Sequence, residues 1–176
     1  MTFELEDIIA LHGRQILVYC HNILCNYHDA QDAVQVTFIK AYNKRGSYKP
    51  TVSLSAWLYK IAYNTCIDII RKRRFSLTGL WGGRPEGSYQ MEENYISEEL
   101  KGALLTLSAR DRALVYNRVI DDMDYKELAV IYNASEAALR KRYERAKNKL
   151  AEQLEAAGIA NSIRNGADRV APENME

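Results

Sequence analysis

A glycine-rich stretch near the middle of the chain divides it into two separate folding units. Residues 77–88 contain four glycines and a proline, and both residue types are poorly tolerated inside helices and strands. We therefore interpret 75–96 as a linker. The 176 residues of the chain leave room for one small domain on each side of it. We predict an N-terminal domain at 1–74, a C-terminal domain at 97–156 and a disordered tail at 157–176.

Apolar residues recur at helical spacing in the first half of the chain and indicate three helices. The first covers the apolar positions between Ile8 and Leu24. We interpret Asp29 as the N-cap of the second helix, because aspartate accepts hydrogen bonds from exposed helix-start amides. Ser53 or Ser55 opens the third helix. The second helix is expected to bury Val34, Phe38, Ala41 and Tyr42.

The second half of the chain shows four helical segments, and no part of the sequence has the alternating pattern of a strand. Ser108 is the expected cap of the second segment, and Asp124 with Glu127 resembles a capping box at the third. Asn133 marks a sharp turn, since asparagine tolerates the left-handed conformation. Ser135 caps the last helix. The fold class is therefore predicted to be all-α. The expected buried residues are Leu114, Val115 and Val119 in the second segment and Leu139, Tyr143, Ala146, Leu150 and Leu154 in the fourth.

A short capped helix, a tight turn and a longer basic helix over 124–150 form a helix-turn-helix pattern. The second helix of such a motif enters the major groove of DNA. Arg140 and Lys141 lie opposite the apolar stripe and are long enough to reach guanine edges or phosphates. An ordinary amphipathic hairpin with a solvated basic face is the alternative. The predicted duplex contacts are Ser135, Glu136, Ala137, Arg140, Lys141, Glu144 and Arg145, with Arg142 and Lys147 as flanking phosphate contacts.

Three segments, in chain order, resemble conserved regions of bacterial sigma factors. Residues 29–42 (DAQDAVQVTFIKAY) resemble the second conserved helix of region 2, and 55–72 resemble the helix that melts and reads the −10 element. Residues 104–150 resemble region 4, with its −35-reading helix-turn-helix. The chain is identified as a member of the extracytoplasmic-function group, which retains only regions 2 and 4. The resemblance implies an alternative sigma factor that directs core RNA polymerase to specific promoters.

The second predicted helix carries a mixed polar and apolar face outside its expected core, and such a face is a candidate docking surface. The resemblance implies that this face grips the β′ coiled coil of core RNA polymerase. It also implies contacts with the β flap and promoter DNA, and it leaves open whether an anti-sigma protein is a partner. A solvated face is the alternative, and it explains the polar members better than the apolar ones. The predicted polymerase contacts are Asp32, Gln35, Val36 and Ile39.

Aromatic and cationic residues on the third predicted helix suit the binding of a separated DNA strand, because aromatic rings stack on bases and cations bind the phosphate backbone. Tyr59 is among these aromatics. The alternative is that Trp57 and some of these tyrosines pack in the core, and for Trp57 the two interpretations are equal. By resemblance, a pocket for an extruded base lies in 48–55 with help from Asn64. Pairing of Arg71 with Asp68 is the alternative to a DNA contact. The predicted −10 contacts are Tyr48, Lys49, Trp57, Lys60, Tyr63, Asn64 and Arg71.

This sequence departs from the family pattern at several positions. Val36 stands where the family usually has a glutamate, and Asn133 replaces a usual glycine. Ala137 and Ala138 replace a usual Gly-Thr pair, so a hydroxyl that could meet a phosphate is lost. We therefore expect an unusual −35 preference. The stretch from Glu86 to Glu99 carries five glutamates and no Lys or Arg. The resemblance implies that this acidic linker lies in the RNA exit path, where its glutamates would imitate nucleic acid.

The sequence contains no recognisable enzyme site, metal-ligand set or cofactor motif, so we expect a protein without catalysis or cofactor. The run from Cys20 to His28 could be imagined as a metal site, but its cysteines are interpreted as structural and its histidines as structural or solvated. No apolar run approaches the roughly 20 residues needed to cross a bilayer, and the acidic start is unlike a signal peptide. We expect a cytoplasmic protein without membrane insertion.

Two other function classes fit parts of the sequence. A self-sufficient repressor or activator would bind duplex DNA tightly alone, but a net charge of +1 is small for such a binder. A decoy would occupy polymerase without reading DNA, and the basic last helix argues against it.

Overall fold

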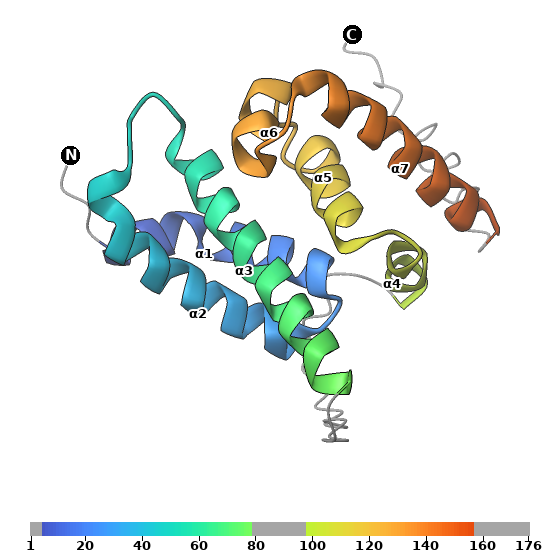
Figure 1. Cartoon of the computed structure of the whole chain (residues 1–176), viewed down its shortest axis with the longest axis horizontal. Helices are drawn as coiled ribbons and strands as arrows, with labels where there is room; N and C mark the ends of the chain where they lie inside the picture. Colours follow the sequence, from blue (N-terminus) through green and yellow to red (C-terminus); the bar gives the residue numbers. More distant parts are fainter. Residues whose placement is uncertain (1–4, 79–97, 157–176) are drawn as a thin grey trace, which may run out of the picture.

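The computed structural model describes residues 5–78 and 98–156, and every regular element in these ranges is helical (Figure 1). The predicted all-α fold is confirmed. Most of the predicted linker and the predicted tail lie outside the described residues, but 75–78 continue the third helix. The elements are α1 (Leu5–Leu24), α2 (Tyr27–Lys44), the 3₁₀ turn η1 (Arg45–Ser47), α3 (Leu54–Thr78), α4 (Glu98–Leu105), α5 (Ala109–Val119), α6 (Tyr125–Tyr132) and α7 (Glu136–Ala156).

Helix α2 begins earlier than the sequence predicts. The chain reverses at Cys25, which adopts a left-handed φ of 51°. Asn26 then caps α2, and its side chain accepts a hydrogen bond from the Asp29 amide at 3.0 Å. The prediction of Asp29 as the cap is therefore wrong. Asparagine caps as well as aspartate does, and the reversal at Cys25 places Asn26 at the helix start.

Small residues line the buried side of α2. Thr37 is fully buried, and its hydroxyl donates to the Ala33 carbonyl at 2.6 Å. The predicted burial of Tyr42 is wrong, since this side chain is 41% exposed and its ring lies 4.0 Å from the Arg45 guanidinium. An alanine-rich stripe lets α1 and α3 approach α2 closely, which leaves the large ring outside. The buried residues of α2 are Ala30, Ala33, Thr37, Phe38 and Ala41.

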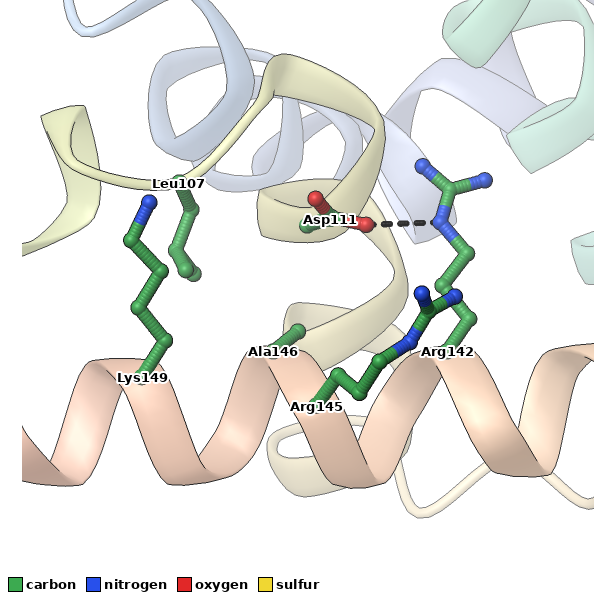
Figure 2. Close-up of a pocket in the computed structure, with 6 residues that line it drawn as sticks. All are labelled: Leu107, Asp111, Arg142, Arg145, Ala146 and Lys149. Atoms are coloured by element: carbon green, nitrogen blue, oxygen red, sulfur yellow. Dashed lines mark hydrogen bonds and ion pairs between the residues drawn. The ribbon is translucent and has the colours of Figure 1, made fainter.

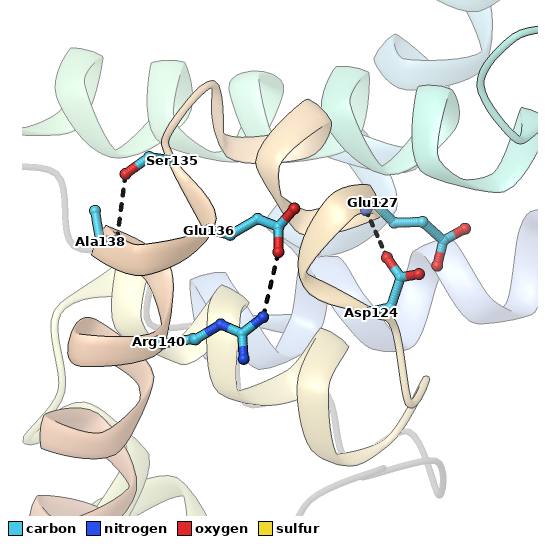
Figure 3. A network of polar contacts seen from close by, with 6 residues as sticks. All are labelled: Asp124, Glu127, Ser135, Glu136, Ala138 and Arg140. Atoms are coloured by element: carbon cyan, nitrogen blue, oxygen red, sulfur yellow. Dashed lines mark hydrogen bonds and ion pairs between the residues drawn. The ribbon is translucent and has the colours of Figure 1, made fainter.

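The caps predicted in the second half are confirmed. Ser108 accepts from the Asp111 amide at 3.2 Å, and Asp124 accepts from the Glu127 amide at 2.8 Å (Figure 3). Asn133 adopts φ 50° and ψ 52°, the left-handed region, and ends α6. In α5 the predicted burial of Val119 is wrong, since it lies at the helix end and is 55% exposed. Ser135 accepts from the Ala138 amide at 3.3 Å and caps α7.

The N-terminal half (α1–α3) and the C-terminal half (α4–α7) pack against each other. Helix α5 lies on α1, and α6 lies on α3 (Figure 1). One hydrophobic core runs through both halves, from Ile16 and Leu58 to Leu114 and Leu128. The sequence predicts two domains, and no pattern in it indicates whether they touch.

Replacing Asn133 with alanine should lower the free energy of unfolding by about 1 kcal/mol. The Cβ of alanine is strained in the left-handed region, and alanine has no polar side chain to form the local hydrogen bonds that help asparagine adopt it. Asn133→Gly should leave stability unchanged or raise it, since glycine adopts this conformation freely. Urea denaturation of the full chain measures both. Equal destabilisation by both variants would contradict the backbone explanation and point to a role of the asparagine side chain.

Candidate nucleic-acid interface

The first turns of α7 carry an exposed basic surface. Arg140, Lys141, Glu144 and Arg145 line a shallow groove on this helix, and all four side chains are exposed. Leu139 and Ala146 are buried on the opposite side, which fixes the rotation of the helix. The structure therefore gathers the residues predicted for the −35 element on one side of α7. Of the seven, Glu136 is half-buried and the exposed ones are Ser135, Ala137, Arg140, Lys141, Glu144 and Arg145.

Arg140 is held in place by two neighbours. Its Nη2 lies 3.2 Å from the Glu136 carboxylate (Figure 3), and its guanidinium lies 4.6 Å from the centre of the Tyr125 ring. Tyr125 also lies 5.6 Å from the Arg118 guanidinium. Tyr125 was not among the residues predicted from the sequence. An aromatic residue at the first position of the preceding helix was the available signal.

Arg142 is paired inside the protein. Its Nε donates to Asp111 Oδ1 at 2.6 Å and ties α7 to α5 (Figure 2). Burial alone would raise the pKa of Asp111, but hydrogen bonds from Ser108 and Arg142 and the charge of Arg145 outweigh it and lower this pKa. Arg145 lines the same pocket and is exposed. Arg142 therefore has a structural partner that the predicted phosphate contact did not anticipate.

The aromatic residues before and within α3 pack on each other. The Tyr48 hydroxyl donates to the Val52 carbonyl at 2.9 Å, and the Tyr48 and Trp57 ring centres are 5.3 Å apart. Both residues are half-buried. Trp57 thus contributes to local packing while part of it stays accessible. Ser53, not Ser55, caps α3 and accepts from the Ala56 amide at 3.2 Å.

The other predicted −10 residues differ in accessibility. Lys49 and Asn64 are exposed, while Lys60 and Tyr63 are half-buried. Arg71 is exposed and pairs with Asp68 at 2.9 Å, as the alternative predicted. The expected stacking role of Tyr59 is wrong for this structure. Its ring is 2% exposed and lies edge-on to Tyr19 in the core, 4.7 Å between centres.

The candidate polymerase face on α2 is continuous and exposed. Asp32 and Gln35 are exposed polar members, and beside them Val36 is 39% and Ile39 59% exposed. Neighbouring apolar and polar side chains on one accessible helix face suit a protein partner.

Part of the cysteine and histidine run is packed, but Cys25 is half-buried and His28 is exposed. Cys20 and His21 are buried, and the pKa of His21 is lowered by burial and by the nearby Lys101. Among the residues that the structure describes, no group of three or more His, Cys, Asp or Glu could hold a metal ion. Within the same ranges, no helix is long and apolar enough to span a membrane.

Replacing Arg142 with alanine should lower the free energy of unfolding by about 1 kcal/mol, because a half-buried Asp111 loses a charged hydrogen-bond donor. The pKa of Asp111 should rise in the same variant. Arg145→Ala is the matched control, since it removes an exposed guanidinium from the same groove and should leave stability nearly unchanged. Thermal unfolding and an NMR titration of the carboxyl groups measure the two effects. An Arg142→Ala protein as stable as the parent would exclude the structural role of this pair.

Two parts of the chain match known families. Residues 8–76 match Sigma-70 region 2, and residues 97–150 match Sigma-70 region 4. These ranges coincide with α1–α3 and with α4 to most of α7. The chain therefore belongs to the sigma-70 family, in its extracytoplasmic-function (ECF) group. It is an alternative sigma factor that directs RNA polymerase to promoters and initiates transcription.

Related proteins resemble the chain over most of its length. The ECF RNA polymerase sigma factor SigW of Bacillus subtilis is 28% identical over 165 residues, which cover 84% of this chain and 87% of SigW. The RNA polymerase sigma factor YlaC of Bacillus subtilis is 28% identical, and the aligned region covers 86% of this chain and 92% of YlaC. The sigma factor RpoE, solved with the anti-sigma factor NepR from Bartonella quintana, is 26% identical with a TM-score of 0.74. The superposed region covers 85% of this chain and 96% of RpoE.

Proposed function

We propose that the functional surfaces of this sigma factor are distributed over three helices. The first turns of α7 read the −35 element, α3 with the loop before it holds the melted −10 element, and the exposed face of α2 binds polymerase. The observation that carries this proposal is the exposed basic surface at the start of α7, set directly after the left-handed turn at Asn133.

The α7 surface suits duplex DNA for two reasons. Arg140, Lys141 and Arg145 are exposed on the side away from the core, where they can approach base edges and phosphates. The ring of Tyr125 and the carboxylate of Glu136 already orient Arg140, so less side-chain freedom is lost on binding. We infer that Arg140 reads a base edge and that the flanking cations position the helix on the backbone.

The α3 region suits a separated strand. Exposed Asn64 offers an amide donor and acceptor, while Lys49 and Lys60 supply positive charge. Trp57 and Tyr63 are partly accessible aromatic rings, which can stack on bases. We propose the loop 48–53 and the start of α3 as the site for a base displaced from the duplex.

The polymerase contacts follow from exposure and chemistry. We propose that the α2 face of Asp32, Gln35, Val36 and Ile39 binds the β′ coiled coil and that the C-terminal half binds the β flap. The protein performs no bond chemistry of its own and acts in the cytoplasm. RpoE is solved with the anti-sigma factor NepR. By analogy, we propose that an anti-sigma protein binds this chain.

Replacing Arg140 with alanine should weaken promoter recognition, because one base-directed guanidinium is lost at a cost of about 1–3 kcal/mol. Transcription with core polymerase and a promoter library measures the yield of discrete transcripts for each −35 sequence. Arg14→Ala, an exposed cation on α1, is the matched control and should transcribe normally. The affinity for core polymerase should stay unchanged. Full promoter selectivity without Arg140 would overturn the assignment of the α7 surface.

Replacing Gln35 with alanine should weaken core polymerase binding while the promoter preference of the surviving holoenzyme stays the same. The cause is the loss of a polar contact in the α2 face, and the expected effect is about 1 kcal/mol. Competition binding to core polymerase measures it. Asn43→Ala, an exposed amide on the same helix outside the face, should bind like the parent. If the two variants bind alike, the α2 face is assigned wrongly.

A further inference from the structure

The ring of Tyr125 is shared by two arginines, one from the helix before α6 and one from the helix after it. The Arg140 guanidinium of α7 lies 4.6 Å from the ring centre, and the Arg118 guanidinium of α5 lies 5.6 Å from it. Both distances are within the roughly 6 Å over which a cation is attracted to an aromatic face. Tyr125 is the first residue of α6 and is half-buried. It therefore connects the proposed recognition helix with α5.

The turn between α5 and α6 holds Arg118 in place. Its Nη1 donates to the Asp122 carboxylate at 2.8 Å and to the Met123 carbonyl at 3.2 Å. The carbonyl belongs to the main chain and has no rotamers of its own, so it restricts the arginine more than a surface carboxylate alone would. Arg118 is also only 31% exposed. It is therefore a fixed neighbour of the Tyr125 ring.

Arg140 is the more exposed of the two arginines. Its side chain is 60% exposed, and its Nη2 bonds the Glu136 carboxylate one turn earlier on α7 (Figure 3). Each guanidinium thus has a carboxylate of its own, which offsets the repulsion between two cations that share one ring. The five residues that line this open cleft together are Arg118, Asp122, Tyr125, Glu136 and Arg140.

Two kinds of DNA contact place different demands on an arginine. A phosphate contact depends mainly on charge, and it carries no sequence information. A guanine contact needs two N–H groups of one guanidinium aligned with O6 and N7 of the base. A guanidinium has five such donors, so Arg140 keeps donors for a base after Nη2 has bonded Glu136. The orientation of the guanidinium therefore decides base discrimination, whereas its charge decides general affinity.

We propose that Tyr125 is a positioning residue for −35 recognition: its ring, supported by Arg118, orients the Arg140 guanidinium toward a guanine and so sets the base preference at that one position. Tyr125 does this without touching the base. The inference rests on the proposed role of α7, in which Arg140 reads a base edge. It adds that the base is guanine and that the reading unit consists of three residues from α5, α6 and α7.

Transcription of a promoter library randomised over the −35 element, with core polymerase and the full chain, measures the preference for each base at each position. Arg140→Ala identifies the position that Arg140 reads. Tyr125→Leu keeps a large apolar side chain at this half-buried site but removes the ring. It should lower the guanine preference at that position about three- to fivefold and leave the other positions unchanged. Tyr125→Phe keeps the ring and should retain the preference.

Tyr143→Leu is the matched control. Tyr143 is a half-buried tyrosine of α7, and its ring lies 5.6 Å from Lys147 Nζ. Any loss of stability in this variant should lower the transcript yield equally for all −35 sequences. NMR relaxation of the Arg140 Nε gives a second readout without DNA. The Arg140 side chain should be restricted in the parent and in Tyr125→Phe, and more mobile in Tyr125→Leu. Circular dichroism checks that each variant keeps its helices.

Several outcomes would overturn the positioning role. One is an unchanged guanine preference in folded Tyr125→Leu protein. Another is a loss of yield spread evenly over all −35 sequences, which would indicate a packing role or a direct phosphate contact of Tyr125. A base other than guanine at the position read by Arg140 would contradict the assignment of guanine. If Arg140→Ala changes no base preference, the proposed role of α7 itself fails. If it removes a guanine preference that Tyr125→Leu retains, only the positioning role fails.

Discussion

The position of the C-terminal half depends on one buried guanidinium. Arg112 reaches the end of α1 through the Ile23 carbonyl, and through Nη1 it reaches the carbonyls of Leu107 at 2.8 Å and Leu104 at 3.3 Å. A buried charge is costly unless its donors are bonded, so these carbonyls must converge on it. Burial lowers the pKa of Arg112. Helices α1, α4 and α5 are thereby brought to one point, and the contacts of Tyr19 with Tyr116 and Tyr132 follow from that placement.

The same placement leaves the two proposed DNA-reading surfaces unequally accessible. The basic start of α7 faces outward, with Arg140 held against Tyr125, while Tyr63 of α3 is partly covered by Tyr132. Helix caps at Ser108, Asp124 and Ser135 set the lengths and turns of the C-terminal half. Local backbone chemistry thus positions α7, the proposed recognition helix, and packing between the halves decides how much of α3 is exposed.

Sequence patterns predicted the helices and most of their caps, because helical periodicity and capping are local properties. They also predicted the exposed faces of α2 and α7, since a stripe of apolar residues marks the buried side of each helix. They misplaced the start of α2, where a reversal at Cys25 made Asn26 the cap. They also misjudged Tyr59. A tyrosine has the same place in a sequence pattern whether its ring faces DNA or packs against a second domain, so the pattern does not distinguish the two.

The sequence by itself determined an all-α chain in two halves, a helix-turn-helix with its turn at Asn133, and the side of α7 that faces outward. The tertiary structure alone decided that the halves close on each other through Tyr19, Tyr132 and Arg112. The physical reason lies in the partners of Arg112. Its acceptors are main-chain carbonyls, which every residue possesses, so no residue type in the sequence marks where a buried arginine will bind.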